Sequence, residues 1–130
     1  MKRGAAVRRK LSKAERQAVY DKYGGRCAYC GCKLDIKDMQ VDHIESIRRH
    51  DLDAIYGKDV SWLDELNNFN PACRACNFYK GEMPLDFMRE QLGEILKRLD
   101  KVFIFRLAVK YGLVQITPKP IKFYFERGRL

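Results

Sequence analysis

The sequence has no run of about 18 apolar residues, the length that a membrane-spanning helix needs. Residues 1–10 lack the apolar core of a secretory signal, and the chain contains no internal repeat or low-complexity tract. Neither a membrane protein nor a secreted protein is therefore expected. We expect a cytoplasmic, intracellular protein that has no membrane partner.

The chain has 130 residues, of which 46% are hydrophobic and 12% aromatic, more than a disordered chain of this charge would carry. One globular domain over residues 1–130 is expected. The formal net charge of +9 is uneven, with +8 in residues 1–33, −5 in residues 34–72 and +6 in residues 73–130. Basic flanks around an acidic centre suit a polyanion held at a site whose carboxylates bind a cation. A soluble basic protein without such a site would have the same net charge.

Four of the five cysteines form two Cys-x-x-Cys pairs, Cys27/Cys30 and Cys73/Cys76, which are separated by 42 residues. In a reducing compartment such pairs are metal ligands more often than disulfides. Four thiolates complete a tetrahedron around zinc at about 2.3 Å, which leaves Cys32 over. A redox site is the alternative, but a thioredoxin-like site uses one pair and has no need of a second. The pairs therefore predict one structural Zn²⁺.

The N-terminal third begins with a basic arm, residues 1–10, whose Arg8, Arg9 and Lys10 are candidate contacts to phosphate. Ser12 and Glu15 form a capping box, which predicts a helix that ends at Gly24-Gly25. Residues 39–44 alternate with period two and predict a strand in which Asp42 and His43 point to opposite sides.

The rest of the chain divides into a connection and a C-terminal extension. Residues 45–65 are expected to be polar and exposed, with a short helical turn capped at Ser61, and Trp62 is expected to anchor them to the core rather than to stack on a base. After Pro84, apolar residues at helical spacing over 85–99 predict one amphipathic helix that forms core. A second helical stretch is expected over 101–111, and alternation at 121–126 predicts a terminal strand.

Three short motifs follow the first cysteine pair in order, and the last two overlap at Cys73 of the second pair. They are Asp42-His43-Ile44, then N-x-x-P-x-C from Asn68 to Cys73, then C-x-x-C-N-x-x-K-G from Cys73 to Gly81. In these residues the chain resembles the HNH endonuclease family, in the branch with a four-cysteine zinc. The resemblance covers about residues 24–81. It implies a small α+β fold, in which a zinc-stabilised ββα-metal core carries an N-terminal helix and, over 82–130, C-terminal helical and strand additions.

The resemblance also implies a role for each matching residue. His43 corresponds to the general base, and Asn68 to the asparagine that holds the loop and orients the His43 imidazole. Asp42 and Asn77 correspond to the ligands of a catalytic Mg²⁺ or Mn²⁺. Asn77 departs from the family's usual histidine, but an amide oxygen is a competent ligand for a hard cation. Asn67, one position earlier, is the alternative to Asn68.

Phosphodiester hydrolysis needs an activated water and a cation that neutralises charge on the phosphate, and these residue types supply both. The expected function is that of a metal-dependent HNH endonuclease acting on DNA. Lys80 is expected either to contact phosphate or to be solvated. Two rival interpretations stay open: a non-catalytic zinc module that binds nucleic acid or protein, and a nuclease subunit of a phage packaging or restriction system that works with a partner protein. Double-strand cleavage by so small a chain would need a homodimer.

Overall fold

The computed structural model describes residues 10–127, which fall into two compact units. Unit 1 contains the described residues up to Pro84 together with those from Phe123 onward, and unit 2 is Leu85–Lys122. The candidate contacts Arg8 and Arg9 lie outside the described residues, whereas Lys10 is described and exposed. The assignment of residues 1–130 to a single domain stays a prediction.

Unit 1 begins with helix α1 (Lys13–Asp21), which is placed by the predicted capping box. The Ser12 hydroxyl accepts from the Glu15 amide, and the Glu15 carboxylate accepts from the Ser12 amide. After the helix, Gly25 has a φ of +79°, and a Cβ there would lie 2.8 Å from the Tyr20 hydroxyl. Glycine is therefore required where the chain turns back toward the first cysteine pair.

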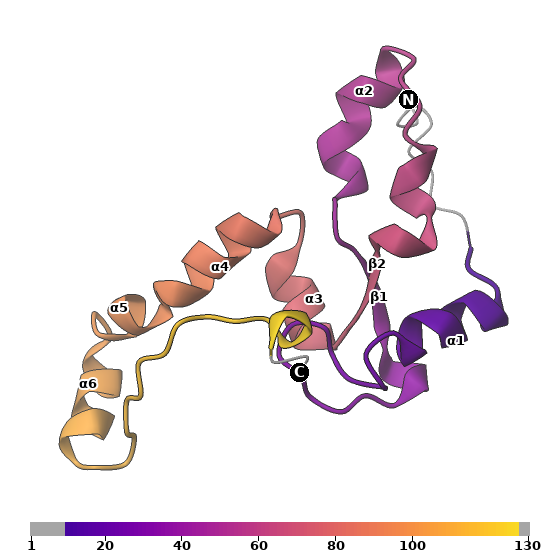
Figure 1. The fold of residues 1–130 in the computed structure, drawn as a ribbon. Helices are drawn as coiled ribbons and strands as arrows, with labels where there is room; N and C mark the ends of the chain where they lie inside the picture. Colours follow the sequence, from indigo (N-terminus) through magenta and orange to yellow (C-terminus); the bar gives the residue numbers. More distant parts are fainter. Residues whose placement is uncertain (1–9, 128–130) are drawn as a thin grey trace. The chain divides into compact units, whose positions relative to one another are not determined.

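A two-stranded antiparallel sheet forms the centre of unit 1 (Figure 1). Strand β1 (Gln40–His43) pairs with β2 (Phe69–Ala72), so that Gln40 faces Ala72 and His43 faces Phe69. Helix α3 (Arg74–Lys80) follows β2 and contacts β1, while α1 contacts β2. Val19 of α1, Met39 just before β1 and Phe69 of β2 form a buried apolar cluster. The predicted strand is thus confirmed, and the elements occur in the order β1, β2, α3.

Residues 44–68 connect the two strands and are mostly exposed or half-buried, as expected, but they also form a small buried apolar cluster that was not expected. The cluster consists of Ile47, Val60 and Leu63. Trp62 is 43% exposed and packs edge to face on His50, with ring centroids 5.3 Å apart, so it does not anchor the segment to the core. The segment contains four short helical elements: η2 (Ile47–His50), α2 (Asp51–Ile55), η3 (Ser61–Asp64) and η4 (Leu66–Asn68).

The expected terminal strand at 121–126 was also wrong, because residues from Tyr124 to Glu126 form a 3₁₀ turn, η5. The Tyr124 and Phe125 amides donate to the carbonyls of Tyr29 and Ala28 at 3.0 and 3.1 Å. Phe123 is buried and meets the Tyr29 ring edge to face at 5.4 Å. Two hydrogen bonds to a tight loop cannot extend into a strand ladder, so the alternating pattern serves here to bury aromatic side chains against the first cysteine pair.

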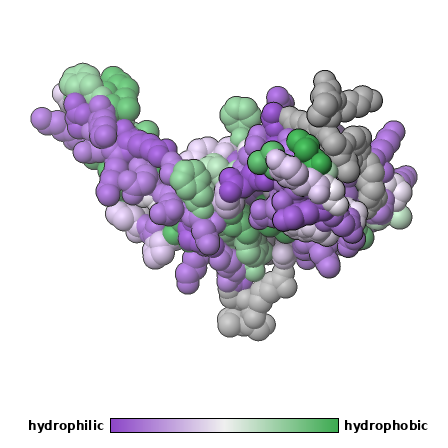
Figure 2. All heavy atoms as spheres, turned by 90° about the horizontal axis from the view of Figure 1, so that it is seen from above, coloured by the Kyte–Doolittle hydropathy of each residue, from purple (hydrophilic) through white to green (hydrophobic). Residues whose placement is uncertain are grey.

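Unit 2 consists of α4 (Leu85–Gly93), α5 (Ile95–Leu99) and α6 (Phe103–Lys110). The predicted single helix over 85–99 is interrupted after Gly93, and Met88 is the fully buried member of its apolar series. The second predicted helix is confirmed as α6. The exposed apolar residues of α6 include Phe103 and Ile104, and Figure 2 shows green apolar side chains on the surface of the molecule. Within residues 10–127, no helix combines the length and the apolar character that crossing a membrane requires.

Candidate metal centre and active site

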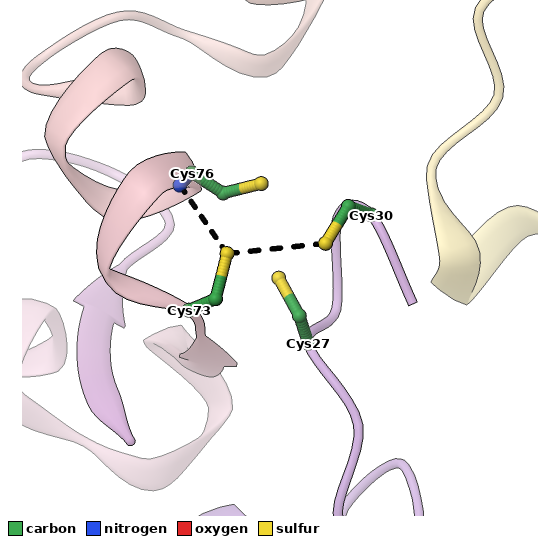
Figure 3. Close-up of side chains that lie close together, drawn as sticks. All are labelled: Cys27, Cys30, Cys73 and Cys76. Carbon is green, nitrogen blue, oxygen red and sulfur yellow. Dashed lines mark hydrogen bonds between the residues drawn. The ribbon is translucent and has the colours of Figure 1, made fainter. Parts of the chain in front are cut away.

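The four paired cysteines converge on one point from two segments of the chain (Figure 3). Cys27 and Cys30 lie on the loop after α1, Cys73 is the N-cap of α3, and Cys76 is in its first turn. All four sulfur atoms lie within 4.8 Å of one another, and the Cys30 and Cys73 sulfurs are 3.8 Å apart. A tetrahedron with bonds of about 2.3 Å has edges of about 3.8 Å, so the cluster has the size that Zn²⁺ requires.

Backbone amides donate hydrogen bonds to two of these sulfurs. The Tyr29 amide donates to Cys27 Sγ and the Cys76 amide to Cys73 Sγ, each at 3.4 Å. A separate side-chain hydrogen bond between the Cys27 and Cys76 thiols lowers the pKa of Cys27 to about 4 and raises the pKa of Cys76. Cys32 is exposed and lies outside the four-sulfur cluster, as the sequence predicts.

His43, the predicted base, lies at the end of β1 and is held on two sides. Its Nε2 is 2.8 Å from Oδ1 of Asp64, at the end of η3. Its ring meets the Phe69 ring edge to face, with centroids 5.0 Å apart. The His43 and Asp64 side chains are 15% and 19% exposed. Sequence reasoning missed Asp64, because its distance of 21 residues along the chain from His43 hides the pairing.

Asn68 is buried and joins the loop after His43 to the segment that carries Asp64. Its Oδ1 accepts from the Glu45 amide at 2.9 Å, and its Nδ2 donates to the carbonyls of Glu45 and Leu63 at 3.1 and 2.8 Å. These bonds fit the predicted loop-holding role and favour Asn68 over Asn67, which is exposed. The side-chain hydrogen bond to the imidazole is made by Asp64 and not by Asn68, so any effect of Asn68 on the orientation of the ring would be indirect.

Asp42 lies in a buried polar network instead of an open site. It is 4% exposed, accepts a hydrogen bond from the Tyr29 hydroxyl, and lies 3.3 Å from the Lys80 ammonium. Burial raises the pKa of the Asp42 carboxyl, and the positive charge of Lys80 opposes that rise. Burial beside Asp42 also raises the pKa of Tyr29.

Lys80 was expected to contact phosphate or to be solvated, and neither expectation fits its position. The side chain is fully buried, and its ammonium donates to the His43 carbonyl at 2.9 Å as well as pairing with Asp42. An ammonium so enclosed cannot reach a DNA backbone. The lysine instead ties α3 to the end of β1, where the predicted base lies.

A pocket of about 270 Å³ brings three of the predicted residues together. Its lining includes Asp42 and His43 from β1 and Asn77 from α3, and Arg48 and Glu82 also line it. The Arg48 guanidinium and the Glu82 carboxylate are 3.3 Å apart, and both are about half exposed. The lining thus includes a carboxylate and an amide residue, the types of donor that Mg²⁺ and Mn²⁺ prefer, beside an imidazole, although the Asp42 oxygens already contact Tyr29 and Lys80.

No match was found when the chain was compared with protein-family models, with curated proteins and with solved structures. The grounds for assigning a function are therefore the chain's own motifs and the geometry of the cluster and the pocket.

Proposed function

We propose that this chain is a metal-dependent endonuclease of the HNH type, which hydrolyses phosphodiester bonds in DNA. The observation that carries the proposal is the pocket in which Asp42, His43 and Asn77 meet. The order β1, β2, α3 around that pocket, with cysteine pairs before β1 and at the start of α3, supports the same assignment. Since a zinc module that only binds would have no need of an imidazole in a polar pocket, the pocket favours catalysis.

The zinc would be structural, held by Cys27, Cys30, Cys73 and Cys76. Four protein thiolates leave no open position for water, so this metal would fix the loop after α1 to the start of α3 and take no part in the reaction. A two-stranded sheet is marginal by itself in water. The metal would therefore supply much of the stability of the β1, β2, α3 core.

In the reaction, His43 accepts a proton from a water molecule while the water oxygen forms a bond to phosphorus. The bond from phosphorus to the leaving ester oxygen breaks, and that oxygen takes a proton from solvent. General-base catalysis of this kind contributes about 10²- to 10⁴-fold to a rate. Holding the ring at the end of β1 against Phe69 is what makes this contribution available, because a freely rotating imidazole would seldom face the water.

A divalent cation, Mg²⁺ or Mn²⁺, would be held by Asp42 and Asn77, and when bound it would neutralise charge on the phosphate oxygens. Asp42 already has Lys80 beside it. A carboxylate has about four lone-pair directions, so the hydrogen bonds from Tyr29 and Lys80 leave Asp42 a lone pair with which to coordinate a cation. Since the ammonium cancels much of the carboxylate's charge, we expect the free protein to bind the cation weakly and the DNA phosphate to strengthen that binding.

DNA would be bound chiefly through its phosphates. The chain has a net charge of +9, and Lys10 and Arg48 are exposed. Arg48 also lines the pocket, where Glu82 now pairs with it, so it is well placed to exchange that carboxylate for a phosphate. A single proposed active site cuts one strand, so we expect nicking by a single copy, and double-strand cleavage only with a second copy or a partner protein.

The test is nicking of supercoiled plasmid by the purified zinc-loaded protein across a panel of divalent cations. We expect nicked circles with Mg²⁺ or Mn²⁺ and none with a chelator of these ions. Asn77→Ala should need more cation than the parent does, because it loses one proposed ligand and leaves the buried pair of Asp42 and Lys80 intact. A protein that binds the plasmid and leaves it intact with every cation would instead be a non-catalytic zinc module.

A further inference from the structure

We propose that Asp64 is the positioning residue for His43, fixing which ring nitrogen faces the reacting water. The inference rests on the proposed function, in which His43 is the base. The structure places Asp64 Oδ1 2.8 Å from His43 Nε2, a normal hydrogen-bond distance. It does so across a separation of 21 residues, from η3 to the end of β1.

The chemistry of the pair determines the state of the imidazole. An ionised carboxylate only accepts hydrogen bonds, so a neutral His43 must carry its proton on Nε2 to make this bond. Its Nδ1 then has the free lone pair. Nδ1 is thus the atom that takes the proton from water, and Asp64 Oδ1 faces the resulting positive ring and stabilises it.

The surroundings of Asp64 hold the carboxylate in place. Leu63, its neighbour in η3, is buried in the apolar cluster of the connection. The Leu63 carbonyl accepts from Asn68 Nδ2 at 2.8 Å, and the same amide group bonds both backbone groups of Glu45, two residues after His43. One buried amide therefore ties together the two segments that carry the pair. Asn68 orients the imidazole indirectly, by keeping Asp64 in reach of it.

A merely structural ion pair would account for the same distance. In such an ion pair the ring would carry a positive charge, with a proton on both nitrogens, and would have no defined tautomer. A positioning role makes a different demand, since it requires the Nε2–H tautomer in the neutral ring. The two accounts therefore differ in a spectroscopic signal that does not depend on catalysis.

The first measurement is the ¹⁵N spectrum of the two histidines in the full-length zinc-loaded protein, with His50→Gln used to assign His43. We expect the neutral His43 ring to be in the Nε2–H form in the parent and in Asp64→Glu. In Asp64→Ala it should relax toward a mixture. In Asp64→Asn the amide can donate to Nε2, which favours the opposite tautomer. A parent whose His43 carries its proton on Nδ1, or an unchanged tautomer in both Asp64→Ala and Asp64→Asn, would overturn the proposal.

The second measurement is single-turnover plasmid cleavage at saturating protein. Asp64→Asn should lose about 10- to 100-fold in rate, less than His43→Ala, with unchanged zinc content and DNA affinity. The double variant His43→Ala with Asp64→Asn should be no slower than His43→Ala, because Asp64 acts through the ring. The matched control is Asp59→Asn, which should cleave at the parental rate. Asp59 is an exposed acid of the same connection, and its carboxylate accepts a hydrogen bond from the Ser61 amide.

The two proposals fail in different ways. If the parent never cuts DNA, the nuclease assignment is wrong, while the tautomer result still decides whether Asp64 fixes the ring. If the parent cuts and Asp64→Asn cuts equally fast, Asp64 has no positioning role and the nuclease assignment stands. Asp64→Asn keeps the shape of the side chain, so it remains informative if Asp64→Ala fails to fold.

Discussion

Replacing Lys80 by methionine should strongly destabilise unit 1 without acting on DNA contacts directly. The change keeps most of the apolar stem and removes the ammonium, leaving the Asp42 carboxylate buried at 4% exposure without its cation. Breaking one side of a buried pair costs about 3–5 kcal/mol, because the remaining charge is uncompensated. The half-buried His43 carbonyl also loses a donor at 2.9 Å, which adds to the loss of stability.

The assay is urea unfolding of the zinc-loaded protein, followed by a signal from unit 1. The matched control is Lys58→Met, whose ammonium is 73% exposed and 3.6 Å from Asp53, and it should change the free energy of unfolding by less than about 0.5 kcal/mol. Adding Asp42→Asn to Lys80→Met should recover part of the loss, since the orphaned charge is then gone. A Lys80→Met protein that is as stable as the parent, but binds DNA more weakly and with a flatter salt dependence, would refute the buried-pair reasoning.

Three further predictions concern zinc, the connection and the basic arm. Cys73→Ser should lose the single zinc and unfold far more easily, because thiolate zinc contributes of the order of 10 kcal/mol to folding. The control Cys32→Ser should keep the metal, and elemental analysis and thermal unfolding of both variants check this. Asn68→Ala should cost about 1–3 kcal/mol and slow cleavage while Asn67→Ala does neither, and equal effects of the two in unfolding and cleavage assays would remove the bridging role of Asn68. Deleting residues 1–10, which carry five basic and no acidic residues, should flatten the dependence of DNA affinity on salt by about 0.9 in log–log slope for each phosphate that the arm neutralises, and an unchanged slope in a binding titration would mean that the arm neutralises none.

Features governed by near neighbours could be predicted from the sequence. The capping box at Ser12 and the alternation at 40–43 depend on residues two to four positions apart, and both produced the observed elements. The cysteine cluster is a long-range feature, but the chemistry of zinc allows few other uses of two Cys-x-x-Cys pairs. The need for four ligands around one zinc ion therefore predicts that the two pairs lie close together, although they are far apart in the sequence.

Features that depend on contacts between segments far apart in the sequence could not be predicted. Lys80 has the same motif position whether it is solvated or buried, and the burial arises because α3 packs on β1 next to Asp42. Asp64 meets His43 only because the connection folds on its own apolar cluster. The alternation at 121–126 is compatible with a strand and also with a 3₁₀ turn that packs aromatic side chains on the first cysteine loop. The observed turn is fixed by hydrogen bonds from the Tyr124 and Phe125 amides to the carbonyls of Tyr29 and Ala28, which are distant in the sequence.

The measurement that tests the central claim most directly is single-turnover cleavage of supercoiled plasmid with Mg²⁺ or Mn²⁺ by the parent, by His43→Ala and by His50→Ala. The account predicts that the parent and His50→Ala nick the plasmid at similar rates. It predicts that His43→Ala loses about 10²- to 10⁴-fold while keeping its zinc, its fold and its affinity for DNA. Parental rates in His43→Ala, or no cleavage by the parent with any divalent cation, would contradict it.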